Sequence, residues 1–292
     1  MNALSNIPDE VVIESLLTSF NLGRLTEAGT LAKRQALLYP GTAIGWKVMS
    51  AVRFLSGECK EAMALLLHAV DSDPEDAESQ FNLAVILERL NQKENATRAY
   101  LQAIRIRPGY PEAYNNLGNL LRDQGHKGAS EAAYREALKS RPGYLMAQGN
   151  LARSLRDQGQ LGAARVAYQS ALCIQPDFSD AYSNLGVTLK DLGECASASR
   201  QFRRAIQINP GLPEAYSNRG IALFDMSAFN EASLSYQKAL ILRPNYPQAL
   251  NNLGNSLRLQ ERMSLAAQCF KRALIIDPSY AEGHNNDGIV EY

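Results

Sequence analysis

Apolar and small residues recur along the chain at the spacing of one face of a helix. Within residues 111–144, four residues share such a face at 100° per residue: Tyr114, Leu117, Gly118 and Leu121. A second stretch with helical spacing follows this one, and it carries small alanines and one aromatic ring. The same two stretches recur along the chain. The pattern predicts pairs of helices that pack through these apolar faces.

The helix pairs recur with a fixed period, which the prolines mark most clearly. Eight prolines follow one another at intervals of 34 residues: Pro40, Pro74, Pro108, Pro142, Pro176, Pro210, Pro244 and Pro278. Because proline ends a helix, each is placed after a second helix, at position 32 of a repeat. The repeats are then 9–42, 43–76, 77–110, 111–144, 145–178, 179–212, 213–246 and 247–280. Residues 1–8 form a tail, and residues 281–292 begin a ninth repeat.

Three further positions of the repeat carry residue types with a physical reason to be there. Glycine at position 8, in Gly118, Gly186, Gly220 and Gly254, costs a helix about 1 kcal/mol against alanine, which predicts a closely packed neighbour. Position 15 is glycine in five repeats, which predicts a left-handed turn between the two helices. Position 24 carries a ring in six: Tyr100, Tyr134, Tyr168, Phe202, Tyr236 and Phe270.

The pattern resembles that of the tetratricopeptide family, W-x2-L-G-x2-Y…A-x3-F…P with a period of 34 residues. Trp46 supplies the tryptophan, and repeat 9–42 matches least well. The resemblance implies an all-α fold, an α-solenoid in which eight helix pairs stack as a right-handed superhelix. We expect one elongated domain without a linker. Residues 281–292 are expected to form a partial terminal helix, either as a cap or as part of a longer chain.

Composition and charge exclude several kinds of partner. Thirty Lys and Arg residues balance thirty Asp and Glu residues, whereas nucleic-acid binders usually carry a basic excess. The first residues show no secretory signal, and no apolar run reaches a membrane span, so we expect a cytoplasmic protein without membrane insertion. The cysteines and histidines are scattered, and a zinc site needs clustered ligands. We therefore expect no metal and no cofactor.

The first helix of each repeat has a polar stripe opposite its apolar face, at positions 2, 6, 9 and 13. In tetratricopeptide proteins this face lines the inner groove. Position 6 is asparagine in seven consecutive helices, position 9 is asparagine in two repeats, and position 13 is aspartate in four. The candidate peptide-binding residues are Asn82, Asn116, Asn119, Asn150, Asn184, Asn218, Asn252, Asn255, Asp123, Asp157, Asp191 and Asp225.

Two interpretations of the asparagines remain open. An asparagine side chain offers an acceptor and donors, which match the C=O and N–H of an extended peptide backbone. Alternatively, asparagine at position 6 only serves the packing of the helices. Runs such as NNLGN resemble the repeats of O-linked N-acetylglucosamine transferase and related bacterial proteins, and this resemblance implies the first interpretation for the seven asparagines and four aspartates.

Other features of the stripe suggest or exclude further partners. Val187, Ile221 and Phe224 place apolar groups on it, as an anchor for a ligand side chain or as loose helix packing. A clamp of basic residues for acidic peptides is not expected, because the stripe is largely acidic. The related pentatricopeptide family binds RNA, but its period is one residue longer and an acidic groove repels phosphate.

Two functions are therefore considered. The first is a non-enzymatic scaffold that binds a partner protein or an extended peptide in its groove. The alternative is the substrate-recognition region of a glycosyltransferase whose catalytic domain is absent from this chain. No set of nucleophile, base and orienting residue can be assembled, and the carboxylates recur with the repeat instead of forming a unique pair.

Overall fold

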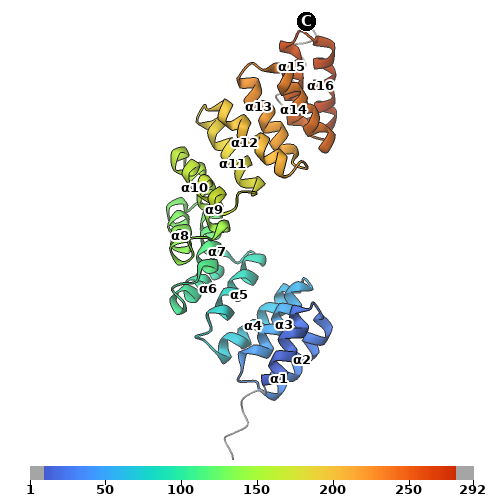
Figure 1. Ribbon diagram of the computed structural model, residues 1–292. Coiled ribbons are helices and arrows are strands. Elements are labelled where there is room, and N and C mark those ends of the chain that lie inside the picture. The colour runs from blue at the N-terminus through green and yellow to red at the C-terminus, as the bar shows by residue number, and fades with distance from the viewer. Residues whose placement is uncertain (1–9, 281–292) are drawn as a thin grey trace, which may run out of the picture. The chain divides into compact units, whose positions relative to one another are not determined.

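The computed structural model describes residues 10–280 and folds them into helices, with no strand in this range (Figure 1). The helices are α1 (Glu10–Asn21), α2 (Leu25–Leu38), α3 (Ala43–Leu55), α4 (Cys59–Ser72), α5 (Ala77–Arg89), α6 (Lys93–Ile106), α7 (Pro111–Asp123), α8 (Lys127–Ser140), α9 (Leu145–Asp157), α10 (Leu161–Ile174), α11 (Ser179–Asp191), α12 (Cys195–Ile208), α13 (Pro213–Asp225), α14 (Phe229–Leu242), α15 (Pro247–Leu259) and α16 (Met263–Ile276). Each predicted repeat holds one helix pair. The predicted all-α fold of eight pairs is confirmed.

The turn inside each pair lies at position 15, as predicted. The five glycines there have φ between +73° and +83°, in the left-handed region that glycine adopts without steric cost. The same conformation occurs at three residues that are not glycine, Asn91, Ser227 and Glu261, with φ of 59°, 60° and 61°. The backbone of the pair therefore imposes this turn whether or not the residue favours it.

Close packing at position 8 explains the glycines in the first helices. A Cβ added to Gly118 would lie 2.6 Å from the ring of Tyr134, and one added to Gly254 would lie 2.4 Å from the ring of Phe270. Gly186 and Gly220 meet Phe202 and Tyr236 in the same way. The ring at position 24 thus fills the space that the missing side chain leaves, and the rings of the six repeats are buried.

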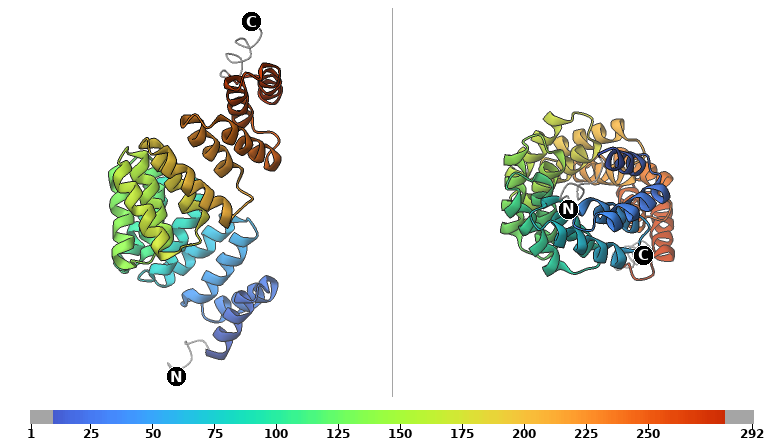
Figure 2. Two further views of the ribbon diagram at one scale, coloured as in Figure 1. Left: turned by 45° about the horizontal axis from the view of Figure 1, so that its top comes forward. Right: turned by 90° about the horizontal axis from the view of Figure 1, so that it is seen from below.

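The described chain forms two compact units. The first ends at Tyr144 and the second begins at Leu145. Within each unit, successive helices lie side by side in chain order (Figures 1 and 2). Each unit has its own buried core of alanines, leucines and rings. The expected single domain without a linker stays a prediction. The predicted tail (1–8) and partial ninth repeat (281–292) lie outside the described residues.

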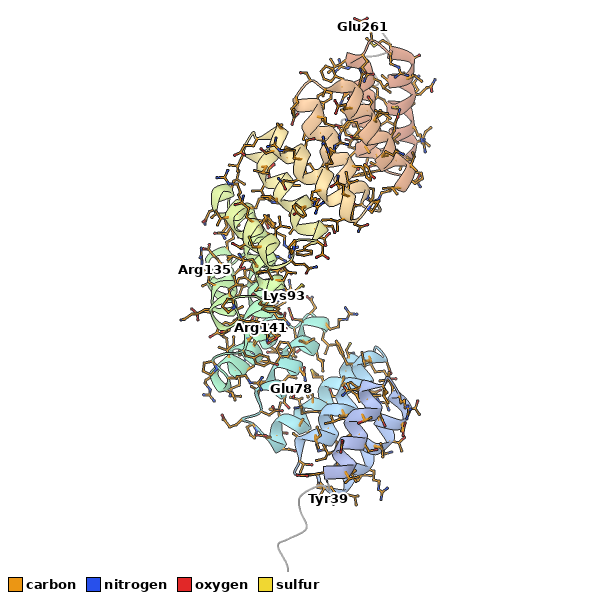
Figure 3. The ribbon with its side chains drawn as sticks, viewed as in Figure 1. Tyr39, Glu78, Lys93, Arg135, Arg141 and Glu261 are labelled. Carbon is orange, nitrogen blue, oxygen red and sulfur yellow. The ribbon has the colours of Figure 1, made fainter. Side chains whose placement is uncertain are left out.

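Charged pairs join elements of one repeat or of neighbouring repeats. Arg141, after α8, lies 2.7 Å from Glu112 at the start of α7, and Lys47 of α3 pairs with Asp76 and Glu78 near the start of α5. Arg141 and Glu78 are labelled in Figure 3.

None of the helices in residues 10–280 is both long and apolar enough to cross a bilayer.

Candidate functional site

The asparagines at position 6 lie on equivalent turns of the first helices, and we call them the asparagine ladder. The first unit has Asn82 on α5 and Asn116 on α7; the second has Asn150 on α9, Asn184 on α11, Asn218 on α13 and Asn252 on α15. All six side chains are half-buried. Asn119 and Asn255, at position 9, follow one turn later on α7 and α15. The asparagine of the ninth repeat, Asn286, lies outside the described residues.

Some asparagines of this face are occupied by bonds within the protein. Asn115 donates to Oδ1 of Asn116 at 3.2 Å, and Arg153 donates to Oδ1 of Asn150 at 3.0 Å. Four others are not occupied. Within residues 10–280, the side-chain amides of Asn82, Asn184, Asn218 and Asn252 form no hydrogen bond with the protein. These four amides are therefore available to a ligand.

The tyrosines at position 24 reach the ladder from behind. Their rings are buried under the first helix, and the hydroxyls of Tyr100 and Tyr134 contact its polar residues. The Tyr134 hydroxyl donates to Oδ1 of Asn119 at 2.8 Å. The Tyr100 hydroxyl donates to Glu88 and is also hydrogen-bonded to Asn116 of the next repeat. Burial raises the pKa of Tyr100 and of Glu88. These hydroxyls were not among the candidates predicted from the sequence, although the choice of Tyr or Phe at position 24 was an available signal.

In two repeats, the contact between a hydroxyl at position 24 and an asparagine at position 9 lacks one of its two members. Tyr168 is 1% exposed, yet its hydroxyl has no hydrogen-bond partner in the described chain. Position 9 of its repeat is Arg153, which offers no acceptor for the hydroxyl proton. The reverse holds in the last repeat. Oδ1 of Asn255 is buried without a partner, and the ring behind it, Phe270, has no hydroxyl to donate.

A pocket of about 290 Å³ opens in the second unit where Tyr168 reaches the ladder. Asn150 and Asn184 contribute two amides to it, and Arg153 and Phe178 also line it. Burial raises the pKa of Tyr168 to about 12, against the opposing effect of the nearby arginines. The hydroxyl is therefore a neutral donor at physiological pH. The pocket combines polar groups suited to a peptide backbone with apolar walls.

The four aspartates at position 13 are exposed at the ends of their helices. Three lie next to a cation at position 12: Asp123 is 3.1 Å from Arg122, Asp157 is 3.7 Å from Arg156, and Asp191 is 3.4 Å from Lys190. The fourth, Asp225, follows Phe224, and the Cys195 thiol donates to its carboxylate at 3.9 Å. It is the member of this set whose charge no described cation neutralises.

The candidate apolar anchor is in part a packing feature. Ile221 and Phe224 pack against the core of the second unit, and the Phe224 ring lies 5.3 Å from that of Phe229 in an edge-to-face contact. Val187 is half-buried on α11. Ile221 and Phe224 still leave part of their surface exposed beside Asp225. An apolar patch next to an unpaired carboxylate suits a ligand with both apolar and basic groups.

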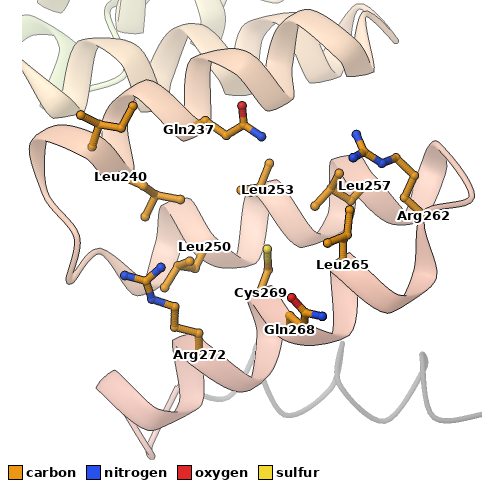
Figure 4. Close-up of a pocket in the computed structure, with 11 residues that line it drawn as sticks. Gln237, Leu240, Leu250, Leu253, Leu257, Arg262, Leu265, Gln268, Cys269 and Arg272 are labelled. Carbon is orange, nitrogen blue, oxygen red and sulfur yellow. The ribbon is translucent and has the colours of Figure 1, made fainter.

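A second kind of pocket lies on the second-helix side of the last two pairs (Figure 4). Its volume is about 540 Å³, and α14, α15 and α16 all contribute to it. Leu250, Leu253 and Leu257 form an apolar floor, and the arginines Arg262 and Arg272 lie at its ends. This surface was not among the candidates predicted from the sequence.

In the described part of the chain, no group of His, Cys, Asp and Glu side chains is clustered closely enough to hold a metal ion. The four cysteines are free thiols, and Cys173 is exposed.

Family models agree with the repeats found in the sequence. Models described as a tetratricopeptide repeat match residues 111–144, 179–209, 213–246 and 247–280, and one described as a TPR repeat matches 89–125 and 152–193. The matched ranges together span more than half of the chain. The chain belongs to the tetratricopeptide-repeat family. Family members bind proteins or peptides, and such repeat folds are typical of non-catalytic scaffold proteins.

Solved structures resemble this tetratricopeptide-repeat protein in fold. YrrB, described as a TPR protein with an unusual peptide-binding site, has a TM-score of 0.55 at 21% identity, over 66% of this chain and 99% of its own. A chain of the Cut9–Hcn1 hetero-tetramer of APC/C has a TM-score of 0.63 at 16% identity, over 100% of this chain and 57% of that chain. PilF of Pseudomonas aeruginosa has a TM-score of 0.63 at 17% identity, over 73% of this chain and 97% of its own.

These likenesses show the fold, and none of them concerns O-linked N-acetylglucosamine transferase. The specific resemblance to the repeats of that enzyme stays a prediction. No curated protein sequence matches the chain.

Proposed function

We propose that this tetratricopeptide-repeat protein is a non-enzymatic interaction scaffold that binds an extended segment of a partner protein along its asparagine ladder. The observation that carries the proposal is the pocket of the second unit. There the free amide of Asn184 and the unpartnered hydroxyl of Tyr168 share one cavity with Asn150. The peptide-binding site that gives YrrB its description lends support from a protein of similar fold.

The chemistry of these groups favours a peptide backbone as the ligand. An amide side chain can accept from a backbone N–H and donate to a backbone C=O. The Tyr168 hydroxyl can donate to a further C=O, which removes the cost of leaving a buried hydroxyl unpaired. Because the same group recurs at Asn184, Asn218 and Asn252, one extended chain could use several of them without regard to its side chains.

The expected affinity is modest. Each hydrogen bond contributes about 0.5–1.5 kcal/mol net, and ordering a flexible peptide offsets part of the sum. The ladder alone should give dissociation constants on the order of micromolar to millimolar. Tighter binding requires side-chain contacts, for which the exposed parts of Ile221 and Phe224 and the carboxylate of Asp225 are the candidates. A peptide that carries an apolar and a basic residue at adjacent positions would use all three.

The free and the occupied asparagines permit a controlled test. The variant Asn184→Ala, Asn218→Ala, Asn252→Ala removes three amides that have no partner in the protein. We expect binding to a peptide selected from a library of unstructured 12-residue peptides to weaken at least about tenfold, with little change in melting temperature. Binding is measured by fluorescence anisotropy, and folding by circular dichroism.

The matched control replaces Asn116 and Asn119, which bond with Asn115 and Tyr134. This control should lose stability, because buried partners lose their hydrogen bonds. If the triple variant keeps its affinity and instead melts earlier, the asparagines serve packing and the proposal is wrong.

The alternative, a substrate-recognition region of a glycosyltransferase, would use the same asparagines. Its distinguishing feature is a catalytic domain, and no observation on residues 10–280 favours one. The scaffold is therefore the function that we propose.

A further inference from the structure

The second repeat, residues 43–76, lacks the ring that fills the space under the first helix in six other repeats. Position 24 is Leu66 here, and Leu66 is 1% exposed. A leucine is shorter than a tyrosine or phenylalanine by several atoms. The space that the outer part of the ring would occupy is therefore open to another group.

The contacts of Tyr100, the ring of the next repeat, show which residues surround this space in a repeat that has its ring. The Tyr100 ring lies 5.9 Å from Phe81 at position 5, and its hydroxyl contacts Glu88 at position 12 and Asn116 at position 6 of the following repeat. In the second repeat the corresponding residues are Lys47 at position 5, Phe54 at position 12 and Asn82 at position 6 of the following repeat.

A pocket of about 110 Å³ lies in the first unit at this place. Its lining includes all three corresponding residues together with Leu66 itself. The full lining is Lys47, Ser50, Ala51, Phe54, Leu66, Asn82, Val85 and Ile86. The pocket is thus the vacant ring site of the repeat. Ala51, Asn82 and Val85 belong to the polar stripe of the first helices, so the pocket opens on the face that carries the ladder.

Most polar groups around the pocket already have partners. The Ser50 hydroxyl donates to the carbonyl of Ala62 at 2.7 Å. The Lys47 amine bonds with Asp76 at 2.9 Å and with Glu78. The amide of Asn82 is the polar group that has no partner in the described chain. An entering polar or charged side chain would lose its hydration without compensation, whereas an apolar one would gain from leaving water.

We propose that this pocket binds one apolar side chain of leucine size from an extended peptide, while the Asn82 amide holds the adjacent backbone. An apolar cavity of roughly 150 Å³ takes up a benzene-sized molecule, so 110 Å³ suits a branched aliphatic side chain. Tyrosine is disfavoured, because Phe54 stands where Glu88 accepts the hydroxyl of Tyr100. The inference rests on the proposed function: the ladder binds the peptide backbone, and this pocket in the first unit of the protein selects one of the peptide's side chains.

The test uses small probes that reach the pocket and Asn82 but no other asparagine of the ladder. The full chain is labelled with ¹³C in the methyl groups of Ile, Leu and Val, and is titrated with N-acetyl-leucine methylamide and with N-acetyl-alanine methylamide. We expect saturable shifts of the Val85 and Ile86 methyl signals with the leucine probe, at an affinity about 10- to 50-fold above that of the alanine probe, because three more carbons are buried.

Two variants fill the pocket in different ways. Leu66→Phe supplies the ring that the other repeats have and should abolish the response of Val85 and Ile86. Ala51→Leu narrows the opening and serves the same purpose if the first variant folds poorly beside Ser50. The matched control is Leu67→Phe, the same change on the next residue of α4, which is 42% exposed and does not line the pocket. The control should respond like the original chain.

The outcomes separate this inference from the ladder. Equal responses to the two probes, no response at Val85 and Ile86, or a response that survives both filling variants would overturn the pocket, whatever the second unit binds. A leucine response that disappears in the filled variants, alongside peptide binding that ignores the Asn184, Asn218 and Asn252 changes, would support the pocket and refute the ladder.

Discussion

Tyr134 and Asn119 form a pair that the chain repeats imperfectly. The tyrosine hydroxyl at position 24 meets the asparagine at position 9 at 2.8 Å. In the last repeat the asparagine is present as Asn255, but the ring is Phe270, and Oδ1 of Asn255 stays buried and unpaired. A buried acceptor without a partner costs about 1–3 kcal/mol. Residues at these two positions therefore act together, although Asn119 and Tyr134 lie 15 residues apart in the sequence, on different helices.

The first prediction restores the missing half of that pair. Phe270→Tyr should stabilise the protein by about 1 kcal/mol, because the new hydroxyl can donate to Oδ1 of Asn255. Thermal and urea unfolding measure the change. The control is Tyr134→Phe, which breaks the intact pair and should destabilise by a similar amount. If Phe270→Tyr destabilises the chain instead, the added oxygen does not reach Asn255 and the equivalence of the two repeats fails.

At the scale of helices, the turn of each pair is the same whatever residue occupies it. The sequence pattern predicted this turn only where position 15 is glycine. Glu261, labelled in Figure 3, adopts φ of 61° between α15 and α16 all the same. An L-residue in this region costs roughly 1–2 kcal/mol, which the packing of the pair outweighs. Local propensity therefore located the five glycine turns, and tertiary packing outweighs the local preference at Ser227 and Glu261.

The second prediction follows from that cost. Glu261→Gly should stabilise the protein by about 0.5–1 kcal/mol, since the relief of strain exceeds the added freedom of the unfolded chain. Asn91→Gly should have a smaller effect, because asparagine tolerates the left-handed region better than glutamate does. Chemical denaturation of both variants measures the difference. A loss of stability at Glu261→Gly would mean that the turn does not strain this residue.

Across the whole chain, the prolines and glycines were sufficient to predict the helix pairs, because a period of 34 residues has few structural explanations. The candidate site was predicted less completely. The ladder was visible as a column of asparagines, yet which amides are free depends on neighbours such as Asn115 and Arg153. The vacant ring site was visible only as Leu66 in a column of rings. Its meaning required the contacts of Tyr100, which join residues from three helices.

The last prediction concerns the second unit by itself. Residues 145–292 contain their own core, and the pocket of Tyr168 and the free amides of Asn184, Asn218 and Asn252 all belong to this unit. Because repeats draw their stability from their neighbours, four stacked pairs should suffice for a cooperative fold. We therefore expect the isolated fragment 145–292 to be helical, to melt in one transition, and to bind the selected peptides within about threefold of the full chain. Circular dichroism and fluorescence anisotropy test the two parts separately. A fragment that folds cooperatively but no longer binds would show that the first unit supplies essential contacts, and the second-unit pocket would then not carry the proposed function.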